Sequence, residues 1–251
     1  MASLARYDRI GLTYTETRRA DPTIEAAVWA ALGEATSVVN VGAGTGSYEP
    51  RDRDVIAVEP SPTMIESRPP EAAPAVQGSA EALPLADDAA DAALAVFTLH
   101  HWSDVRRGLA ELRRVARQRI VMLTWDKSFA GTFWLTRDYL PELEEWTIDR
   151  LPSIEEIEAD LGCRVERRPL PIPHACRDGF LRAYWGRPEA YLEESVRRNI
   201  SQFNVIDSAS VRRGVDRLRA DLSTGVWDSR HGHLRRLDSI DLGYVILVCD
   251  V

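Results

Sequence analysis

The sequence predicts a doubly wound α/β fold, in which helices cover both faces of a mostly parallel sheet. Three observations support this prediction. Short apolar runs alternate with helical patterns through the first half of the chain. The runs are continuously apolar, which is typical of strands buried on both faces. One run leads into the glycine-rich turn Gly42–Gly46, a kind of loop that lets a ligand approach the backbone at the edge of such a sheet.

The first predicted element is a helix. Asp21 suits its N-cap, Pro22 suits its first turn, and Gly33 suits the left-handed position after its last turn. Apolar residues recur between these signals at helical spacing: Ile24, Ala27, Val28, Ala31 and Leu32.

Four apolar runs follow as the predicted strands: Ser37–Val41, Val55–Val58, Ala92–Phe97 and Ile120–Thr124. Between the last two lies an amphipathic helix, for which Ser103 is the predicted cap.

The pattern loosens after Thr124, and the segment beyond it is predicted to be an excursion from the same domain. A capping box at Ser153 and Glu156 begins one helix, which ends near Leu161–Gly162. The other elements expected here are helices over Phe133–Trp146, Pro188–Asn199 and Ala209–Leu222, and strands over Arg164–Leu170 and Gly243–Asp250. The predicted organisation is therefore a cap segment (1–35), a cofactor-binding core (36–125), a helical substrate lid (126–242) and a final sheet strand (243–251).

The composition is that of an ordinary globular protein. The 251 residues are 45% hydrophobic and 28% charged, and the net charge is −8. Nucleic-acid-binding proteins usually carry a basic face. The densest basic stretch, Arg113–Arg119, lies on and just after the predicted amphipathic helix, which indicates a solvated face. No apolar run approaches the ~18–20 residues of a membrane span. We therefore predict a small-molecule partner rather than nucleic acid or a membrane.

The cysteines argue against a metal or an iron–sulfur cluster. Cys163, Cys176 and Cys249 have no metal-ligand spacing. Cys249 lies in an apolar run and is predicted to be a buried structural thiol, which suits a reducing cytoplasm. The start of the chain lacks the apolar segment of a secretory signal. We therefore predict a cytoplasmic location and no metal site.

The glycine turn and a nearby acidic residue carry the first functional signal. A side chain at Gly42, Gly44 or Gly46 would keep a ligand away from the backbone. Their spacing differs from the dinucleotide fingerprint, in which the third glycine comes three residues after the second rather than two. Glu59 ends the second predicted strand, where a carboxylate can accept hydrogen bonds from both ribose hydroxyls. Taken alone, these residues could also be a plain loop and a solvated strand-end charge.

Three segments in order make the pattern specific: VVNVGAGTGSY, VIAVEPSPTMI and GSAEALPLADDAADAALAVFTLHHW. Together they resemble the core of the class I S-adenosylmethionine-dependent methyltransferases, and most closely the branch that includes the ubiquinone/menaquinone-biosynthesis and biotin-pathway enzymes. The resemblance covers roughly residues 36–125. It implies a seven-stranded, Rossmann-like methyltransferase fold with a helical lid insertion, S-adenosylmethionine as the cofactor, and transfer of its methyl group to a small molecule.

The resemblance also implies the contacts of the cofactor. The three glycines pass under its methionine and ribose parts, and Glu59 holds the ribose. The other implied contacts are Met64 on the adenine, Ala80 and Glu81 at the adenine edge, and Phe97 and Thr98 beside the methionine moiety.

Two departures from the family pattern affect these expectations. Asn40 stands where the family usually has an acidic residue, so it can accept a hydrogen bond but lacks the charge that would favour an ammonium group. Only eight residues separate Gly46 from Val55, so the helix that normally follows the glycine loop must be one turn or absent. The N-terminal segment, which contains Tyr14 and Arg19, could cover the cofactor instead, with an arginine on its carboxylate. It could equally be a surface arm.

Methyl transfer mainly requires alignment of the acceptor and exclusion of water, but a hydroxyl or protonated nitrogen also benefits from a base. His101, directly after the strand that ends in Phe97, and His174, after a predicted strand of the second half, are the candidate bases. Either could instead be a structural imidazole. Among the aromatic residues after position 128, Trp185 and Tyr191 are the predicted pocket residues, and most of the others are predicted to be helix core.

Two other functions stay open. A nicotinamide-dependent oxidoreductase is disfavoured by the glycine spacing. A non-catalytic cofactor-binding or partner module with the same fold would accommodate Asn40 and the missing helix. The oligomeric state is left open. A measurement of which cofactor raises the melting temperature would distinguish an oxidoreductase from a methyltransferase.

Overall fold

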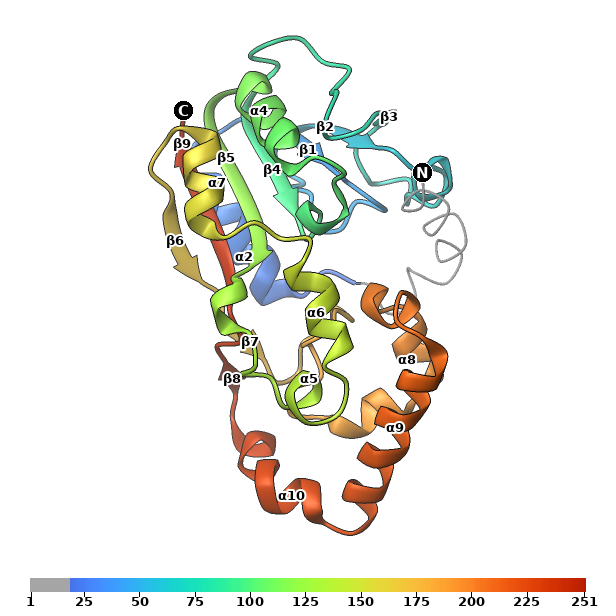
Figure 1. The fold of residues 1–251 in the computed structure, drawn as a ribbon. Coiled ribbons are helices and arrows are strands. Elements are labelled where there is room, and N and C mark those ends of the chain that lie inside the picture. Colours follow the sequence, from blue (N-terminus) through green and yellow to red (C-terminus); the bar gives the residue numbers. More distant parts are fainter. Residues whose placement is uncertain (1–18) are drawn as a thin grey trace.

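The computed structural model describes residues 19–251 and has the predicted doubly wound architecture. A seven-stranded sheet runs in the order β3-β2-β1-β4-β5-β9-β6. All neighbours up to β5 pair in parallel, and β9 pairs antiparallel with both β5 and β6 (Figure 1). The strands are β1 (Ser37–Val41), β2 (Asp54–Glu59), β3 (Ala75–Gln77), β4 (Ala90–Val96), β5 (Ala116–Trp125), β6 (Glu166–Pro169) and β9 (Tyr244–Asp250).

Helices cover both faces of this sheet. Helix α2 (Pro22–Ala31) packs behind β5 and β9, while α4 (Val105–Val115) and α7 (Ile154–Leu161) lie in front (Figure 1). Asp21 caps α2 as predicted, and Ser153 with Glu156 forms the predicted capping box of α7. The cap of α4 is Asp104 rather than Ser103, because the Asp104 carboxylate accepts from the Arg107 N–H.

The rest of the described chain forms a second, mostly helical part, which we call the helical lobe (residues 126–153 and 171–242). The other part is the sheet lobe. In Figure 1 the helical lobe hangs below the sheet. Its elements are α5 (Trp134–Asp138), α6 (Glu142–Ile148), β7 (Ile172–Pro173), α8 (Glu194–Arg198), α9 (Ser208–Ser223), α10 (Val226–His231) and β8 (Ser239–Ile240), with short 3₁₀ turns between them.

The helical lobe is smaller than the predicted lid. Helix α7 packs on α4, and β6 is the edge strand of the main sheet, so the residues between 154 and 169 belong to the sheet lobe. Strands β7 and β8 pair with each other directly beyond β6 and β9. The chain therefore leaves the main sheet at β7 and returns to it at β8, and these two strands lie next to each other.

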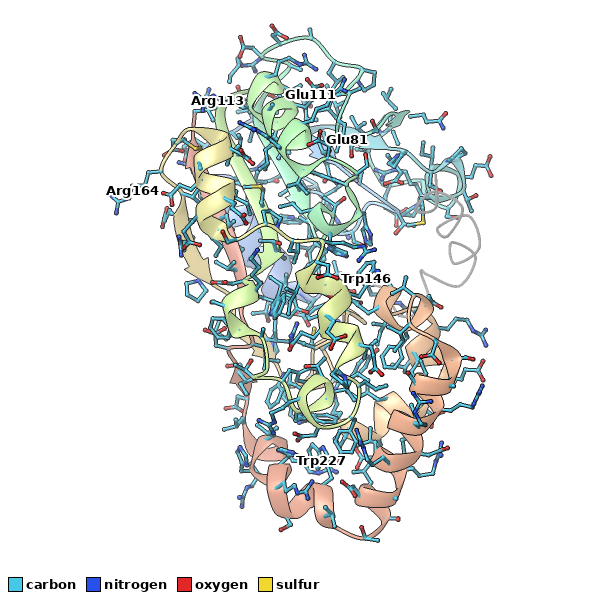
Figure 2. The ribbon with its side chains drawn as sticks, viewed as in Figure 1. Glu81, Glu111, Arg113, Trp146, Arg164 and Trp227 are labelled. Carbon is cyan, nitrogen blue, oxygen red and sulfur yellow. A yellow bond between two sulfur atoms is a disulfide. The ribbon has the colours of Figure 1, made fainter. Side chains whose placement is uncertain are left out.

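Aromatic side chains form the interior of the helical lobe. Trp134 stands edge-on to Tyr191 and Trp227, at ring-centroid distances of 5.7 and 5.2 Å. Trp227 lies at the far end of the lobe in Figure 2. The prediction of Trp185 and Tyr191 as pocket residues is wrong. Both are fully buried, and they donate hydrogen bonds to the backbone carbonyls of Ile172 and Leu181.

One hydrophobic core cluster runs through both lobes. A disulfide also joins Cys249 of β9 to Cys163, just after α7. Cys249 is therefore not the free thiol that the sequence suggested, and the cysteines no longer argue for a reducing compartment. Among residues 19–251, no helix is both long enough and apolar enough to span a bilayer.

The basic stretch on and after α4 is committed to local contacts. Arg114 pairs with Glu111 and Asp87, and Arg117 pairs with Asp91. Figure 2 shows Glu111 and Arg113 together on α4, far from the helical lobe. These guanidinium groups therefore make ion pairs within the sheet lobe while Arg113 and Arg117 stay exposed.

Candidate active site

The carboxyl ends of β1, β2 and β4 meet at one edge of the sheet. Strand order reverses beside β1, since β2 lies on one side of it and β4 on the other. This is the topological switch point at which doubly wound sheets bind ligands. A hollow of about 1000 Å³ opens there, which we call the glycine-loop pocket. Its described lining includes ten of the predicted site residues: Asn40, Gly42, Gly44, Glu59, Met64, Ala80, Glu81, Phe97, Thr98 and His101.

Gly42 makes the turn out of β1 possible. Its φ is +69°, in the left-handed region that favours glycine. A Cβ at this position would lie 2.1 Å from the Thr98 hydroxyl oxygen. The backbone N–H groups of Gly42 and Ala43 both donate to the Val58 carbonyl, at 2.9 and 3.1 Å. The loop is therefore fixed against β2 and against the end of β4.

Glu59 lies at the tip of β2, as predicted, and is tied to the glycine loop. Its carboxylate accepts from the N–H groups of Gly44 (2.8 Å) and Ser61 (3.0 Å). Burial raises the pKa of Glu59, and those two hydrogen bonds and Arg68 oppose the rise only in part. A carboxylate has about four lone-pair sites. Two of them remain for donors on a ligand.

Asn40 is joined to a buried ion pair next to the glycine loop. The Asn40 side-chain amide donates to Glu49 Oε1 at 3.0 Å, and Glu49 forms a buried ion pair with Arg68 at 2.7 Å. Arg68 also donates to the Gly44 carbonyl at 2.9 Å. A buried network thus runs from β1 through the loop after Gly46 and back to the glycine turn, and it holds that turn in place.

Glu81 also lines the pocket, and it holds the start of α4 by hydrogen bonds. Its carboxylate accepts from the N–H (2.6 Å) and the hydroxyl (2.8 Å) of Ser103, and from the N–H of Asp104. Burial acts to raise the pKa of Glu81, but these hydrogen bonds outweigh it and hold the pKa below its ordinary value. Glu81 and Ala80 both line the pocket, and the Glu81 carboxylate also fixes the start of α4.

The prediction that the helix after the glycine loop is short or missing is confirmed, because no helix lies between β1 and β2. Tyr48 occupies this connection with a φ of +67° and lines the pocket. Its hydroxyl donates to Asp178 of the helical lobe at 2.8 Å. Its carbonyl accepts from the Trp29 indole of α2 at 3.0 Å. Tyr48 therefore connects the pocket both to the helical lobe and to α2.

Phe97 and His101 form the other end of the pocket. Phe97 follows β4 with a φ of +53°, an uncommon conformation for a side chain of this size. His101 ends the 3₁₀ turn Leu99–His101 and is half-buried. The next residue, Trp102, packs its ring over Gly108 of α4 and donates to the Thr98 hydroxyl at 3.2 Å. The turn that carries His101 is thereby held against α4.

A second hollow of about 580 Å³ lies beside the first, between the two lobes. We call it the aromatic pocket. Phe97 and His101 line both hollows, so the two are neighbours. The other described lining residues are His100, Thr124, Trp125, Thr147, Leu151, Phe180, Leu181, Arg182, Ile200, Ser201, Gln202 and Tyr244.

Three predicted residues are not brought to these hollows, and a fourth cannot be placed because it precedes residue 19. Gly46 lines neither of them, and a Cβ there would meet Ala72 and Glu49, so it serves loop packing. His174 packs edge-on against Trp185 at 5.2 Å and lies outside both hollows. Arg19 is exposed and lines neither. Tyr14 lies outside the described residues.

Several lining residues were not foreseen. Tyr48 and Ser61 lie inside the quoted segments but had no predicted role. Ser61 could have been found because it caps helix α3 (Pro62–Glu66) with a side-chain bond to the Met64 N–H. Phe180 and Arg182 come from irregular segments of the helical lobe, and Gln202 comes from a 3₁₀ turn. No local pattern marks such residues.

Residues 39–122 match the family described as "Methyltransferase domain". An uncharacterized methyltransferase of Mycobacterium tuberculosis is 36% identical to this chain over 121 residues, which are 45% of this chain and 46% of that protein. The match therefore spans about half the length of that relative.

Two solved structures extend the comparison beyond the glycine-loop region. A putative methyltransferase from an antibiotic biosynthesis pathway of Anabaena variabilis has a TM-score of 0.86 and 34% identity, over 94% of this chain and 99% of that one. A putative methyltransferase of Bacillus halodurans shares the fold, with a TM-score of 0.55 and 13% identity over 90% of this chain and 97% of that one. The similarity to the Anabaena variabilis protein covers both lobes.

Proposed function

The chain belongs to the class I S-adenosylmethionine-dependent methyltransferases, and from this membership we propose that it transfers a methyl group from S-adenosylmethionine to a small-molecule acceptor. The observation that supports this function best is the glycine loop held beside Glu59 at the switch point of the sheet. A second hollow opens where the first one ends, at Phe97 and His101. Two adjoining hollows suit a donor and an acceptor.

The residues of the glycine-loop pocket fit the cofactor. The bare backbone at Gly42 and Gly44 leaves room for a ligand against the loop. Glu59 keeps two acceptor sites for ribose hydroxyls. Met64, Ala80 and Glu81 would hold the adenine, while Asn40, Phe97 and Thr98 would hold the methionine part.

When bound, the cofactor supplies a methyl group already activated on a sulfonium. The protein then has to align the acceptor, exclude water and accept a proton where the acceptor carries one. We propose that His101 is that proton acceptor, since it lines both hollows. We propose that the helical lobe serves as the substrate lid, since its residues form one wall of the aromatic pocket.

The charge distribution of the sheet lobe supports a small-molecule acceptor rather than nucleic acid. The arginines of the basic stretch make ion pairs and hydrogen bonds within the protein rather than forming a free basic face. A cytoplasmic location stays a prediction.

Binding of S-adenosylhomocysteine tests this function, measured by calorimetry on the full chain. We expect it to bind and to raise the melting temperature. Glu59→Ala should weaken binding by about 1–3 kcal/mol, because the ligand and the loop N–H groups lose their acceptor. Glu66→Ala is the matched control, because Glu66 is exposed on the adjacent helix α3.

Unchanged affinity in Glu59→Ala would remove Glu59 from the site. Protection by a nicotinamide dinucleotide instead of S-adenosylhomocysteine would favour an oxidoreductase. Binding without methyl transfer to any member of a broad acceptor panel would favour a non-catalytic module.

A further inference from the structure

The aromatic pocket contains a buried arginine that the proposed reaction does not use. Arg182 is 2% exposed and lines the pocket. Its guanidinium lies over the Trp125 ring at 4.0 Å and forms an ion pair with Glu144. Long charged side chains are seldom buried this fully unless their donors are satisfied.

The donors of Arg182 are under-used. Only Nη2 donates to a described acceptor, the Glu144 carboxylate. Nε is buried and has no hydrogen-bond partner among the described residues. Nη1 donates to no described group. A guanidinium has five N–H donors, so this one retains hydrogen-bonding capacity inside a hollow.

Glu144 does not present a free carboxylate to the hollow. It accepts from the Gly131 N–H at 2.7 Å and from the Thr136 hydroxyl at 3.1 Å, in addition to Arg182. It is not among the residues that line the aromatic pocket. The described lining contains no Asp or Glu, while Arg182, His100 and His101 contribute basic groups. The described lining therefore offers guanidinium donors to an anionic group and presents no carboxylate that would repel it.

Another part of the lining is apolar and aromatic. Phe97, Phe180 and Tyr244 form a cluster with ring-centroid distances of 4.8–5.6 Å. Such a wall suits a planar or otherwise apolar body. Arg182 already donates to Glu144 from one nitrogen. Its remaining donors therefore match a ligand with a single negative charge better than a dianion.

Resting on the proposed function, we propose that the aromatic pocket binds the methyl acceptor, and that this acceptor is an apolar, typically aromatic small molecule with a carboxylate that Arg182 recognises. Phe97 and His101 stand between this pocket and the glycine-loop pocket, so an acceptor anchored at Arg182 extends toward the cofactor site. Arg182 is a binding residue in this scheme and takes no part in bond making.

The test uses matched pairs of aromatic carboxylates and their primary amides, namely benzoate, 2-naphthoate and indole-3-acetate with the corresponding amides. Each is titrated by calorimetry into the full chain saturated with S-adenosylhomocysteine. At least one carboxylate should bind ten-fold or more tightly than its amide, the range expected of a hydrogen bond to a charged group.

Arg182→Gln combined with Glu144→Gln removes both charges together, so no buried carboxylate is left unpaired. This double variant should lose the preference for carboxylate over amide and keep its affinity for S-adenosylhomocysteine. Arg182→Lys should retain part of the preference. Arg187→Gln is the matched control, since Arg187 is a half-buried arginine over Tyr184 that lines neither hollow.

Three outcomes would overturn the inference. The first is an equal affinity for carboxylates and amides in the unaltered protein. The second is a preference that survives in the double variant. The third is a parallel loss of S-adenosylhomocysteine affinity in that variant, which would assign Arg182 to the cofactor instead. Failure of S-adenosylhomocysteine to bind the unaltered protein would count against the proposed function and is read out separately.

Discussion

The two lobes build their halves of the site by different means. In the sheet lobe, most residues that line the glycine-loop pocket lie in the turns and the short helix that follow the carboxyl ends of β1, β2, β3 and β4. In the helical lobe, the aromatic residues pack on one another in the core, while the aromatic pocket receives Phe180 and Arg182 from irregular segments and Gln202 from a 3₁₀ turn. The cofactor half is thus determined by topology, and the acceptor half by tertiary packing.

The largest expected effect concerns the glycine-loop pocket of the sheet lobe. Gly42→Val places a branched side chain at a positive φ and within 2.1 Å of the Thr98 hydroxyl. The loop must move, and we expect a loss of S-adenosylhomocysteine affinity of at least about 100-fold, consistent with the 2–3 kcal/mol of misplaced packing and hydrogen bonds. Calorimetry measures this. Gly232→Ala is the control in the helical lobe, where an added Cβ meets only Asp228 at 3.6 Å.

The next effect concerns the border between the lobes. His101→Ala should lower turnover by about 10²–10⁴-fold if proton removal accompanies transfer, because a positioned base contributes that much. Cofactor affinity should change little. His174→Gln should leave turnover near that of the unaltered protein, since His174 lies beneath Trp185 and outside both hollows. Equal turnover of His101→Ala and the unaltered protein on an acceptor with an ionisable proton would refute the role.

The difference between the lobes explains which parts of the fold were predictable. The four core strands, the cap of α2 and the capping box of α7 depend on residues adjacent in sequence, and they appear where expected. The predicted lid included Glu166–Pro169, which pairs with β9 in the main sheet. The short strand Glu166–Pro169 is mostly polar and exposed, so its sequence does not show that it pairs with β9.

The site shows the same division. Ten predicted residues line the glycine-loop pocket because motif spacing and strand order specify them together. Trp185 looked like a pocket residue because it follows a loop, yet its ring is buried and its indole bonds to the Ile172 carbonyl. The sequence did not mark Arg182 as a site residue, because its burial depends on Glu144, which is 38 residues away. Side chains defined by such distant partners are invisible to local patterns.

The two lobes are joined by the Tyr48–Asp178 hydrogen bond, and a pair of matched variants measures its contribution. Tyr48→Phe removes the 2.8 Å bond between the lobes, and Tyr139→Phe removes a 2.8 Å bond to Asp221 within the helical lobe. Each should lower the free energy of unfolding by about 1–2 kcal/mol. Only Tyr48→Phe should also weaken S-adenosylhomocysteine binding, by a few-fold, because Tyr48 lines the pocket. Equal cofactor affinity in both variants would show that the junction is structural only.

The smallest expected effect distinguishes the lobes by pH. Burial lowers the pKa of His231 below its ordinary value of 6.5, more than its hydrogen bond to Asp138 (3.0 Å) raises it. The unfolded chain therefore binds this proton more readily, so stability is full above pH 6.5 and declines as the pH falls below that value. In the sheet lobe, the lowered pKa of Glu81 places the corresponding loss below pH 4.5.

Urea unfolding between pH 7 and pH 5 therefore reports on the helical lobe. The unaltered protein should lose less than about 1 kcal/mol over this range, because a shift of one pKa unit is worth about 1.4 kcal/mol and the hydrogen bond to Asp138 offsets part of the shift of His231. His231→Asn should remove the decline. Because one hydrophobic core cluster runs through both lobes, the loss should appear in global unfolding. A decline confined to hydrogen exchange in α10, with global stability unchanged, would mean instead that the helical lobe opens by itself.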